Sequence, residues 1–217
     1  MRHQRALNLT RTKRSEYKSA VKAPTKHQVK TEQTRTALLR SARKIFVRDG
    51  FLACRIEDVA ADAGYTRGAF YANFASKEEL FFALMQQEAD KHATRIHAIL
   101  REHNDVKDRL AALRSYYMNS IADRDWGMLT LEFKLLAIRQ PELRPAFADK
   151  LRRIRSSMKL EVITDTLGIN KPDELVRAVL EGFVAALVLE HMFDPNRVSK
   201  SEAAELLAEV FDSFVAR

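Results

Sequence analysis

Residues 64–80 read Gly-Tyr-Thr-Arg-Gly-Ala-Phe-Tyr-Ala-Asn-Phe-Ala-Ser-Lys-Glu-Glu-Leu, and this stretch decides the fold. Together with residues 56–63 before it, it predicts a helix, a tight turn, a short second helix, another turn and the start of a long helix. Gly64 stands where a left-handed residue ends the first helix. Thr66 suits the N-cap of the second helix, because its hydroxyl can accept a bond from an unpaired backbone N–H. The stretch therefore predicts a helix-turn-helix.

The short second helix has two different faces. Three small residues and one phenol share an arc of roughly 160° at 100° per residue: Gly68, Ala69, Tyr71 and Ala72. Phe70 points to the opposite side, toward a core. A helix with so little side chain on one face can approach base edges and phosphates closely, as a recognition helix must. A packed helical hairpin with a glycine turn also has this shape, so shape alone leaves DNA contact open.

The first turn of the short helix carries the residues that would read DNA. Thr66 and Arg67 reach outward where a helix-turn-helix touches bases. Arg67 can make a bidentate contact to guanine, and Tyr71 can donate to a phosphate.

Residues 34–78 resemble the DNA-binding domain of the TetR family of bacterial transcriptional regulators. The resemblance is carried by Thr34-Arg35, Leu38-Leu39, Ala42, Phe46, Gly50-Phe51, Ile56, Val59-Ala60, Ala63-Gly64, Thr66-Arg67-Gly68, Phe70-Tyr71, Asn73-Phe74 and Ser76-Lys77-Glu78. It implies a homodimer of all-helical subunits. In each, an N-terminal three-helix domain binds an operator and a larger helical-bundle domain binds an effector and dimerises.

Ten residues are expected to make up the DNA-binding surface, from these patterns and from the resemblance. They are Thr34, Arg35, Arg55, Thr66, Arg67, Gly68, Ala69, Tyr71, Asn73 and Lys77. Arg67, Thr66 and Ala69 are assigned to bases. The residues assigned to phosphates are Tyr71, Asn73, Lys77, Arg55 and Thr34.

The loop before the first helix of the motif departs from the family pattern. Regulators of this type usually have Thr followed by Ser or Thr, whereas this chain has Cys54 and Arg55. The loss of a capping hydroxyl is worth about 1 kcal/mol, and Arg55 can replace its phosphate contact with a charged one. Cys54 is a redox sensor if a helix N-terminus lowers its pKa, or else a small, semi-buried filler.

The charge of the chain is concentrated at its N-terminus. Residues 1–35 contain ten lysines and arginines against two glutamates, so they carry the whole formal net charge of +8. The poor apolar periodicity of residues 1–30 predicts a flexible arm. Such an arm either follows phosphates or a minor groove beside the recognition helix, or is a solvated tail.

The single cysteine excludes a disulfide within the chain and fits a reducing cytosol. The longest uncharged apolar run near the C-terminus, residues 182–189, is far too short to span a membrane, so we expect a soluble, cytoplasmic protein with no membrane partner. Glu88 and His92 have the spacing of two metal ligands, but a third is missing. The chain also lacks a nucleophile–base set and a glycine-rich phosphate loop. We therefore expect no enzyme activity, cofactor or metal.

Ser76 and Glu79 form a capping box that opens a long helix over residues 77–102. Its start should pack on the DNA-binding domain and its end on the C-terminal domain. The remaining periodicity predicts helices over 105–123, 126–139, 144–167, 173–193 and 200–216. Because no strand pattern occurs, the fold is predicted to be all-α. The expected parts are an arm (1–30), a helix-turn-helix domain (31–78) and an effector-binding and dimerisation domain (79–217).

The last two predicted helices are the richest in apolar residues, including Val176, Val179, Ala186 and Leu206. By resemblance they pair with the same helices of a second copy, although an ordinary core within one chain would show the same pattern. The residues assigned to the dimer interface are Leu180, Phe183, Leu187, Leu207, Val210, Phe211 and Phe214.

Aromatic and methionine side chains on neighbouring helices suggest an adaptable pocket for an apolar or aromatic effector. By resemblance, effectors lie between such helices, although the same residues also fit a plain core. The residues assigned to effector binding are Tyr117, Met118, Trp126, Met128, Phe133 and Met158.

The sequence thus favours a sequence-specific, DNA-binding transcriptional regulator. It is expected to be a homodimeric repressor that a small effector releases from a palindromic double-stranded operator by shifting a conformational equilibrium. The alternative is a non-specific architectural DNA-binding protein driven by the basic arm, which predicts a steep salt dependence with little sequence discrimination. An enzyme or ligand carrier built on a helical bundle is the third possibility, and no motif supports it.

Overall fold

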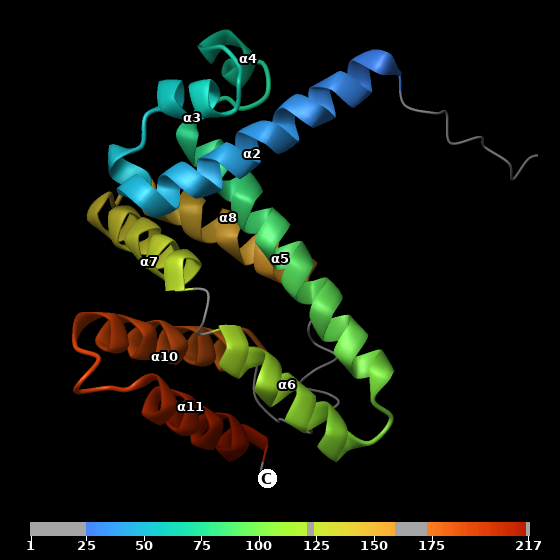
Figure 1. Cartoon of the computed structure of the whole chain (residues 1–217), viewed down its shortest axis with the longest axis vertical. Coiled ribbons are helices and arrows are strands. Elements are labelled where there is room, and N and C mark those ends of the chain that lie inside the picture. Colours follow the sequence, from blue (N-terminus) through green and yellow to red (C-terminus); the bar gives the residue numbers. More distant parts are fainter. Residues whose placement is uncertain (1–24, 121–123, 159–172, 216–217) are drawn as a thin grey trace, which may run out of the picture.

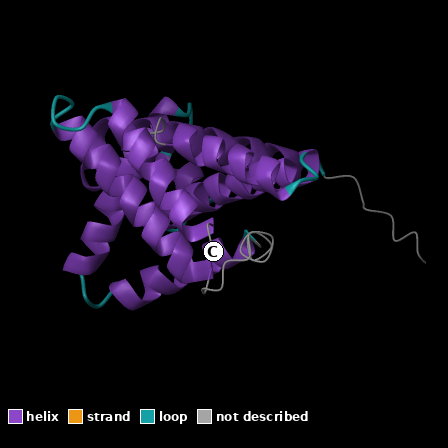
Figure 2. Ribbon diagram, turned by 90° about the horizontal axis from the view of Figure 1, so that it is seen from below, coloured by secondary structure: helices purple, strands orange, loops and turns teal. Residues whose placement is uncertain are grey.

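The computed structural model describes residues 25–120, 124–158 and 173–215. Within these ranges every regular element is a helix, as predicted (Figure 2). The helices are α2 (Lys26–Ala53), α3 (Ile56–Asp62), α4 (Arg67–Tyr71), α5 (Lys77–Glu102), α6 (Val106–Ser120), α7 (Arg124–Arg139), α8 (Arg144–Ser157), α10 (Asp173–Phe193) and α11 (Lys200–Val215).

The long helix α5 runs through the molecule and connects its two ends (Figure 1). Helices α2, α3 and α4 gather around its first turns, and α6 lies at its far end. Helix α7 packs against both α2 and α10, while α8 packs on α5. Helices α10 and α11 pack on each other at the end opposite the helix-turn-helix, and α11 also contacts α6.

Helix α2 begins at Lys26, early enough to include residues for which the sequence predicted a flexible arm. A capping box explains the early start. The Gln28 backbone N–H donates to Thr25 Oγ1 over 3.2 Å, and the Thr25 N–H donates to Gln28 Oε1 over 2.8 Å. Residues 26–30, predicted as part of the flexible arm, are therefore helical. Residues 1–24 lie outside the described part of the chain.

Gly50 breaks the end of α2. Its φ of 80° and ψ of 164° are not helical, and glycine adopts a positive φ without the steric penalty that a Cβ brings. The break turns the chain so that Phe51 packs back into the core, where it is 1% exposed. One further helical turn, residues 51–53, follows before the chain enters the loop to α3.

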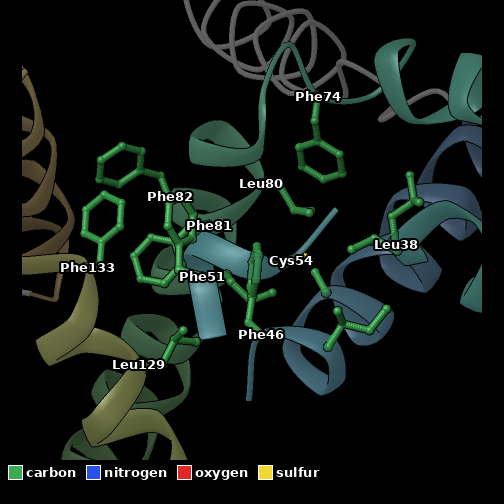
Figure 3. Packing of buried hydrophobic residues seen from close by; sticks show 14 of the residues in the cluster. Leu38, Phe46, Phe51, Cys54, Phe74, Leu80, Phe81, Phe82, Leu129 and Phe133 are labelled. Carbon is green, nitrogen blue, oxygen red and sulfur yellow. The ribbon is translucent and has the colours of Figure 1, made fainter. Parts of the chain in front are cut away.

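One aromatic cluster holds the helix-turn-helix end of the molecule to α7. The rings of Phe81 on α5 and Phe133 on α7 stack with centroids 4.2 Å apart, and Phe51 approaches both at 5.3 Å (Figure 3). Leu151 and Ile154 of α8 belong to the same buried cluster. The core therefore continues across the predicted domain boundary at residue 78, because α7 and α8 supply part of it.

The far end of the molecule has smaller cores. Ile96 and Ile99 of α5 pack on Leu113 of α6, as the sequence predicted for the end of the long helix. A second small cluster joins α10 to α11 through Leu187, Val188, Ala203 and Leu207. None of the described helices is long and apolar enough to cross a membrane.

Serine side chains cap the starts of α5 and α11. Ser76 accepts the Glu79 N–H over 3.2 Å, but the Glu79 carboxylate reaches one residue further back than expected and accepts the Ala75 N–H over 2.6 Å. Ser199 and Glu202 cap α11 reciprocally. Helix α8 ends at Ser157, and the remainder of the helix predicted over 144–167 lies outside the described residues beyond Met158.

Candidate nucleic-acid interface

The helix-turn-helix forms as predicted. Helix α3 ends at Asp62 with Ala63 as its C-cap. Gly64 follows with a φ of 77°, and the Tyr65 N–H closes the turn on the Ala60 carbonyl over 2.8 Å. Thr66 caps α4 by accepting the Ala69 N–H over 3.2 Å. Phe70 is fully buried, whereas Tyr71 on the other face is 46% exposed. The two faces assigned from the sequence are thus the buried and the exposed faces of α4.

The exposed face of α4 carries Thr66, Arg67, Gly68 and Tyr71, with Ala69 half-buried beside them. A Cβ placed on Gly68 would meet only the Thr66 hydroxyl oxygen, at 3.7 Å. This is an ordinary contact, so neither crowding nor a positive φ demands a glycine at residue 68. The fold therefore gives no reason for this glycine.

Arg67 is exposed but held in one orientation. Its Nη1 atom lies 3.0 Å from Glu57 Oε1 on α3, and its guanidinium lies 5.5 Å from the centroid of the Tyr71 ring. A hydrogen bond with Tyr71, followed by the charges of Tyr71 and Glu57, raises the pKa of Arg67 above its ordinary value. Exposed ion pairs contribute only about 0–1 kcal/mol, so Arg67 can exchange Glu57 for another acceptor at little cost.

Arg55 occupies the N-cap position of α3, and within the described chain no side chain caps this helix end. The predicted loss of a capping hydroxyl is therefore confirmed. Arg55 Nε lies 4.0 Å from Glu57 Oε2, so one carboxylate stands between Arg55 and Arg67. Sequence reasoning missed Glu57. The available signal was an acidic residue in the first turn of a helix that is flanked by two arginines.

Lys77 and Thr34, both predicted to meet phosphates, are engaged inside the protein. Lys77 Nζ donates to the carbonyl oxygens of Leu52 and Cys54 over 3.1 and 3.0 Å and lies 4.8 Å from the centroid of the Phe51 ring. The Thr34 hydroxyl donates to the Lys30 carbonyl over 2.9 Å, and the residue is 7% exposed. In this conformation both side chains bind backbone carbonyls of the protein itself.

Arg35 and Asn73 brace the end of α4 against α2. Arg35 Nη1 donates to the Asn73 carbonyl over 3.1 Å, and its guanidinium lies 4.3 Å from the centroid of the Phe74 ring. Asn73 Nδ2 donates to the Ala69 carbonyl over 2.8 Å. These two residues therefore position α4, and their half-buried side chains lie behind its exposed face.

Cys54 is a filler and not an activated thiol. It is 4% exposed, and burial raises its pKa to about 11, against the lowering effect of the Lys77 charge. A redox sensor needs a lowered pKa and solvent access. The sensor interpretation is therefore wrong, because the cysteine lies in the core where α2 ends (Figure 3).

Residues 38–84 match the family described as bacterial regulatory proteins, tetR family. Residues 38–84 therefore belong to a TetR-family DNA-binding domain. This membership means that the exposed face of α4 belongs to a DNA-binding domain.

Relatives of known name differ in how much of the chain they match. The transcriptional activator FasR of Mycolicibacterium smegmatis is 31% identical over 87 residues, and the match covers 40% of each chain. The transposon Tn10 TetC protein of Escherichia coli is 29% identical, and the chain covers 51% of its length. The transcriptional repressor AcnR of Corynebacterium efficiens is 24% identical over 185 residues, covering 84% of this chain and 91% of AcnR.

Solved structures share the whole fold. A putative TetR-family regulator from Rhodococcus sp. superposes with a TM-score of 0.64 at 18% identity, covering 85% of this chain and 99% of that one. The regulator FadR of Bacillus subtilis, solved in complex with stearoyl-CoA, gives a TM-score of 0.61 at 18% identity, covering 83% and 98%. At these identities the likeness establishes the arrangement of helices.

The residues predicted to bind an effector do not all line one space. Phe133 is 1% exposed and packed within the aromatic cluster, so packing accounts for it. Met158 is half-buried and touches both this cluster and the small α5–α6 core. Met128 is half-buried on α7. The side chains of Tyr117, Met118 and Trp126 lie outside the described part of the chain.

The residues predicted for the dimer interface also do not all lie on one exposed surface. Leu187 and Leu207 are buried in the cluster between α10 and α11 of their own chain, with Phe183 packed against it, and Val210 is half-buried. The side chains of Leu180, Phe211 and Phe214 are not among those described. Among the side chains that the structure describes, the large apolar ones that α10 and α11 expose are Leu175, Val179, Leu189, Met192, Phe193 and Leu206.

The Glu88–His92 pair is structural. The Glu88 carboxylate accepts bonds from Arg43 over 2.7 Å and Lys91 over 2.8 Å, and His92 Nδ1 shares a hydrogen bond with the Tyr116 hydroxyl. Among the residues that the structure describes, no group of three or more His, Cys, Asp or Glu side chains is arranged to hold a metal ion.

Proposed function

We propose that this regulator is a homodimeric repressor that reads a palindromic operator with α4 and leaves it when a small apolar or aromatic molecule binds. The exposed face of α4 is the observation that carries the proposal. Thr66 and Arg67 at its first turn are the base-reading residues, and Ala69 follows them. Gly68, for which the fold has no need, allows the helix backbone to approach the duplex closely.

The charge on this face supports an exchange of partners on binding. Glu57 holds Arg67 and Arg55 in place in the free protein. On DNA, Arg67 would transfer to a guanine edge in the major groove, while Arg55 and the exposed Tyr71 would turn to phosphates. Because the ion pairs are exposed, releasing them opposes binding only weakly.

The exposed apolar residues of α10 and α11 support a second copy as partner. Phe193 is 85% exposed at the end of α10, and several apolar neighbours on the same two helices are also uncovered. A two-fold pair of subunits would present two copies of α4, and a two-fold reader requires a palindromic site.

Two relatives bear on the sign of regulation and on the ligand. The repressor AcnR matches over 91% of its length, whereas the activator FasR matches over 40%, which favours repression. FadR, a structural neighbour, was solved with stearoyl-CoA, which favours an apolar effector. The ligand would bind among α5, α6, α7 and α8, near Met128 and Met158.

Selection of duplexes from a random pool at roughly physiological salt tests the proposal. We expect one palindrome with related half-sites. Binding that shows no consensus and collapses as salt rises would overturn it and favour the architectural alternative, in which the basic arm, residues 1–30, dominates.

Substitutions at Arg67 test the reading of bases. Arg67→Ala should lose about 1–3 kcal/mol of discrimination against the wrong base, roughly a 5- to 150-fold effect. Arg67→Lys keeps the charge but not the bidentate geometry, so it should keep non-specific affinity and lose base preference. Arg152→Ala on α8 is the charge-matched control. If base preference survived both Arg67 changes, Arg67 would not read sequence.

A further inference from the structure

The Glu132 carboxylate of α7 accepts two backbone hydrogen bonds from the chain where α2 ends. Its Oε2 atom accepts the Phe51 N–H over 3.0 Å, and its Oε1 atom accepts the Leu52 N–H over 3.2 Å. These two amides follow the Gly50 break and open the last helical turn, where backbone N–H groups have no partner within the helix. A charged acceptor on two successive amides makes a strong, directional contact between elements 80 residues apart.

Gly50 makes room for this carboxylate. A Cβ at Gly50 would lie 3.0 Å from both Glu132 oxygens, a tighter contact than nearly all real Cβ atoms make, so the carboxylate would have to shift to admit it. Residue 50 is therefore a glycine for two reasons. Its positive φ exposes the amides that follow, and its missing side chain leaves space for the carboxylate. The rigid neighbour of Glu132 is Phe133, whose ring is locked in the aromatic cluster.

Lys77 holds the same segment from the other side. Its ammonium group binds the Leu52 and Cys54 carbonyls, while the Glu132 carboxylate binds the Phe51 and Leu52 amides. Residues 50–54 are thus clamped between α5 and α7. The next residue, Arg55, is the N-cap of α3, so the clamp fixes the point at which the chain enters the helix-turn-helix.

Helix α7 connects this clamp to the proposed dimer surface. It packs on α2 at one side and on α10 at the other (Figure 1), and α10 carries the exposed apolar residues described above. The orientation of the helix-turn-helix relative to α10 therefore depends on how firmly α7 holds residues 50–54. In a two-fold dimer that orientation determines where the two copies of α4 point.

We infer that Glu132 is a positioning residue that sets the half-site spacing this regulator accepts in its operator. The inference rests on the proposed function, because spacing has meaning only for a dimer on a palindrome. With the clamp intact, each α4 meets the groove at one distance and angle. Without it the helix-turn-helix can pivot at Gly50, and operators with altered spacing become acceptable.

The experiment compares palindromes whose selected half-sites are separated by the preferred spacing or by one or two base pairs more or fewer. Wild-type protein should prefer one spacing by at least about tenfold, since each added base pair also rotates one half-site about the DNA axis. Glu132→Ala should bring this ratio below about threefold while binding to the half-site sequence persists. Asp125→Asn, a loss of charge at an exposed residue of the same helix, should leave the ratio unchanged.

Two further measurements separate a positioning role of Glu132 from a purely structural one. Amide hydrogen exchange at Phe51 and Leu52 should be at least about tenfold faster in Glu132→Ala, because both acceptors are lost. Glu132→Gln retains the shape and one carbonyl acceptor, so it should show intermediate exchange and an intermediate spacing ratio, and it replaces the alanine variant if that one does not fold.

A variant that melts at a lower temperature but keeps the wild-type spacing ratio would overturn the inference and leave Glu132 a purely structural residue. A wild-type protein that selects no palindrome would overturn the proposed function and this role with it, even if exchange at Phe51 and Leu52 still responded to the substitution.

Discussion

The two ends of this molecule complete their cores in different ways. At the helix-turn-helix end, α2, α5, α7 and α8 close around an aromatic cluster in which Phe81 is 0% exposed. At the other end, α10 and α11 share a small aliphatic cluster and leave Phe193 85% exposed. Burial on this scale is what stabilises a fold. The first region is therefore complete within one chain, whereas the second offers an apolar surface to a partner.

Loss of an aromatic ring from the closed region should have the largest effect. Phe81→Ala leaves a cavity in contact with at least four other aromatic rings, and such changes cost about 3–5 kcal/mol. The free energy of unfolding from urea denaturation measures this. Phe193→Ala is the matched control and should change the stability of the single chain by less than about 0.5 kcal/mol. Equal losses in the two variants would remove the distinction between the regions.

The exposed ring should matter for association instead. If α10 and α11 meet a second copy, Phe193→Ala should weaken the dimer by about 2 kcal/mol, or roughly 30-fold in dissociation constant, as for a central aromatic anchor. Sedimentation equilibrium gives the constant directly. Val29→Ala, at an exposed apolar residue of α2, should leave it unchanged. A dimer that tolerates Phe193→Ala would move the interface away from the end of α10.

Equivalent caps in the two regions offer a smaller and more local test. Ser76 caps α5 and Ser199 caps α11 through the same kind of bond, and either change to alanine should cost about 1 kcal/mol. The two variants should lose stability in different parts of the molecule. Hydrogen exchange should rise across the whole helix-turn-helix end in Ser76→Ala, but within α10 and α11 alone in Ser199→Ala. Uniform changes in both variants would indicate a single cooperative unit.

The smallest effect concerns acid stability. Bonds from Lys44 and then Ser41 lower the pKa of Asp62 at the end of α3. A lowered pKa in the folded state adds stability above the unfolded value of about 3.9, and this stability is lost as the pH falls through the folded pKa. Asp62→Asn should therefore be less stable than wild type near neutral pH, and the difference should disappear in strong acid. Urea midpoints measured from pH 6 downward would show this, and a constant difference would contradict it.

Local signals in the sequence predicted the fold well. Helices α5 and α10 have the predicted bounds because the Ser76 hydroxyl caps the first and Asp194-Pro195 follows the end of the second. The stripe of Leu38, Ala42, Ile45 and Phe46 is buried as its spacing required. The start of α2 was missed because its capping box, Thr25 to Gln28, directly follows Pro24 in a segment whose charge indicated an arm.

The candidate site was predicted less completely, since residue type does not fix the direction of a side chain. Lys77 fits a phosphate contact by position, yet two backbone carbonyls left open at the end of α2 bind it instead. Glu132 is 80 residues from its partner Leu52, and no periodic pattern links positions so far apart. The sequence also does not show which apolar residues are exposed. Leu187 and Phe193 belong to one apolar helix, but only contact with α11 determines which of them is covered.

Cys54 has a practical consequence. It is the only thiol in the chain, and it lies in the core beside the segment that Lys77 and Glu132 clamp. Burial and a pKa of about 11 keep it unreactive at neutral pH while the fold is closed. A thiol-specific reagent therefore labels the protein only when this region opens, so the wild-type chain contains its own chemical reporter. Its labelling rate would follow the loosening of the helix-turn-helix in any variant, or in the presence of any small molecule, without an added probe.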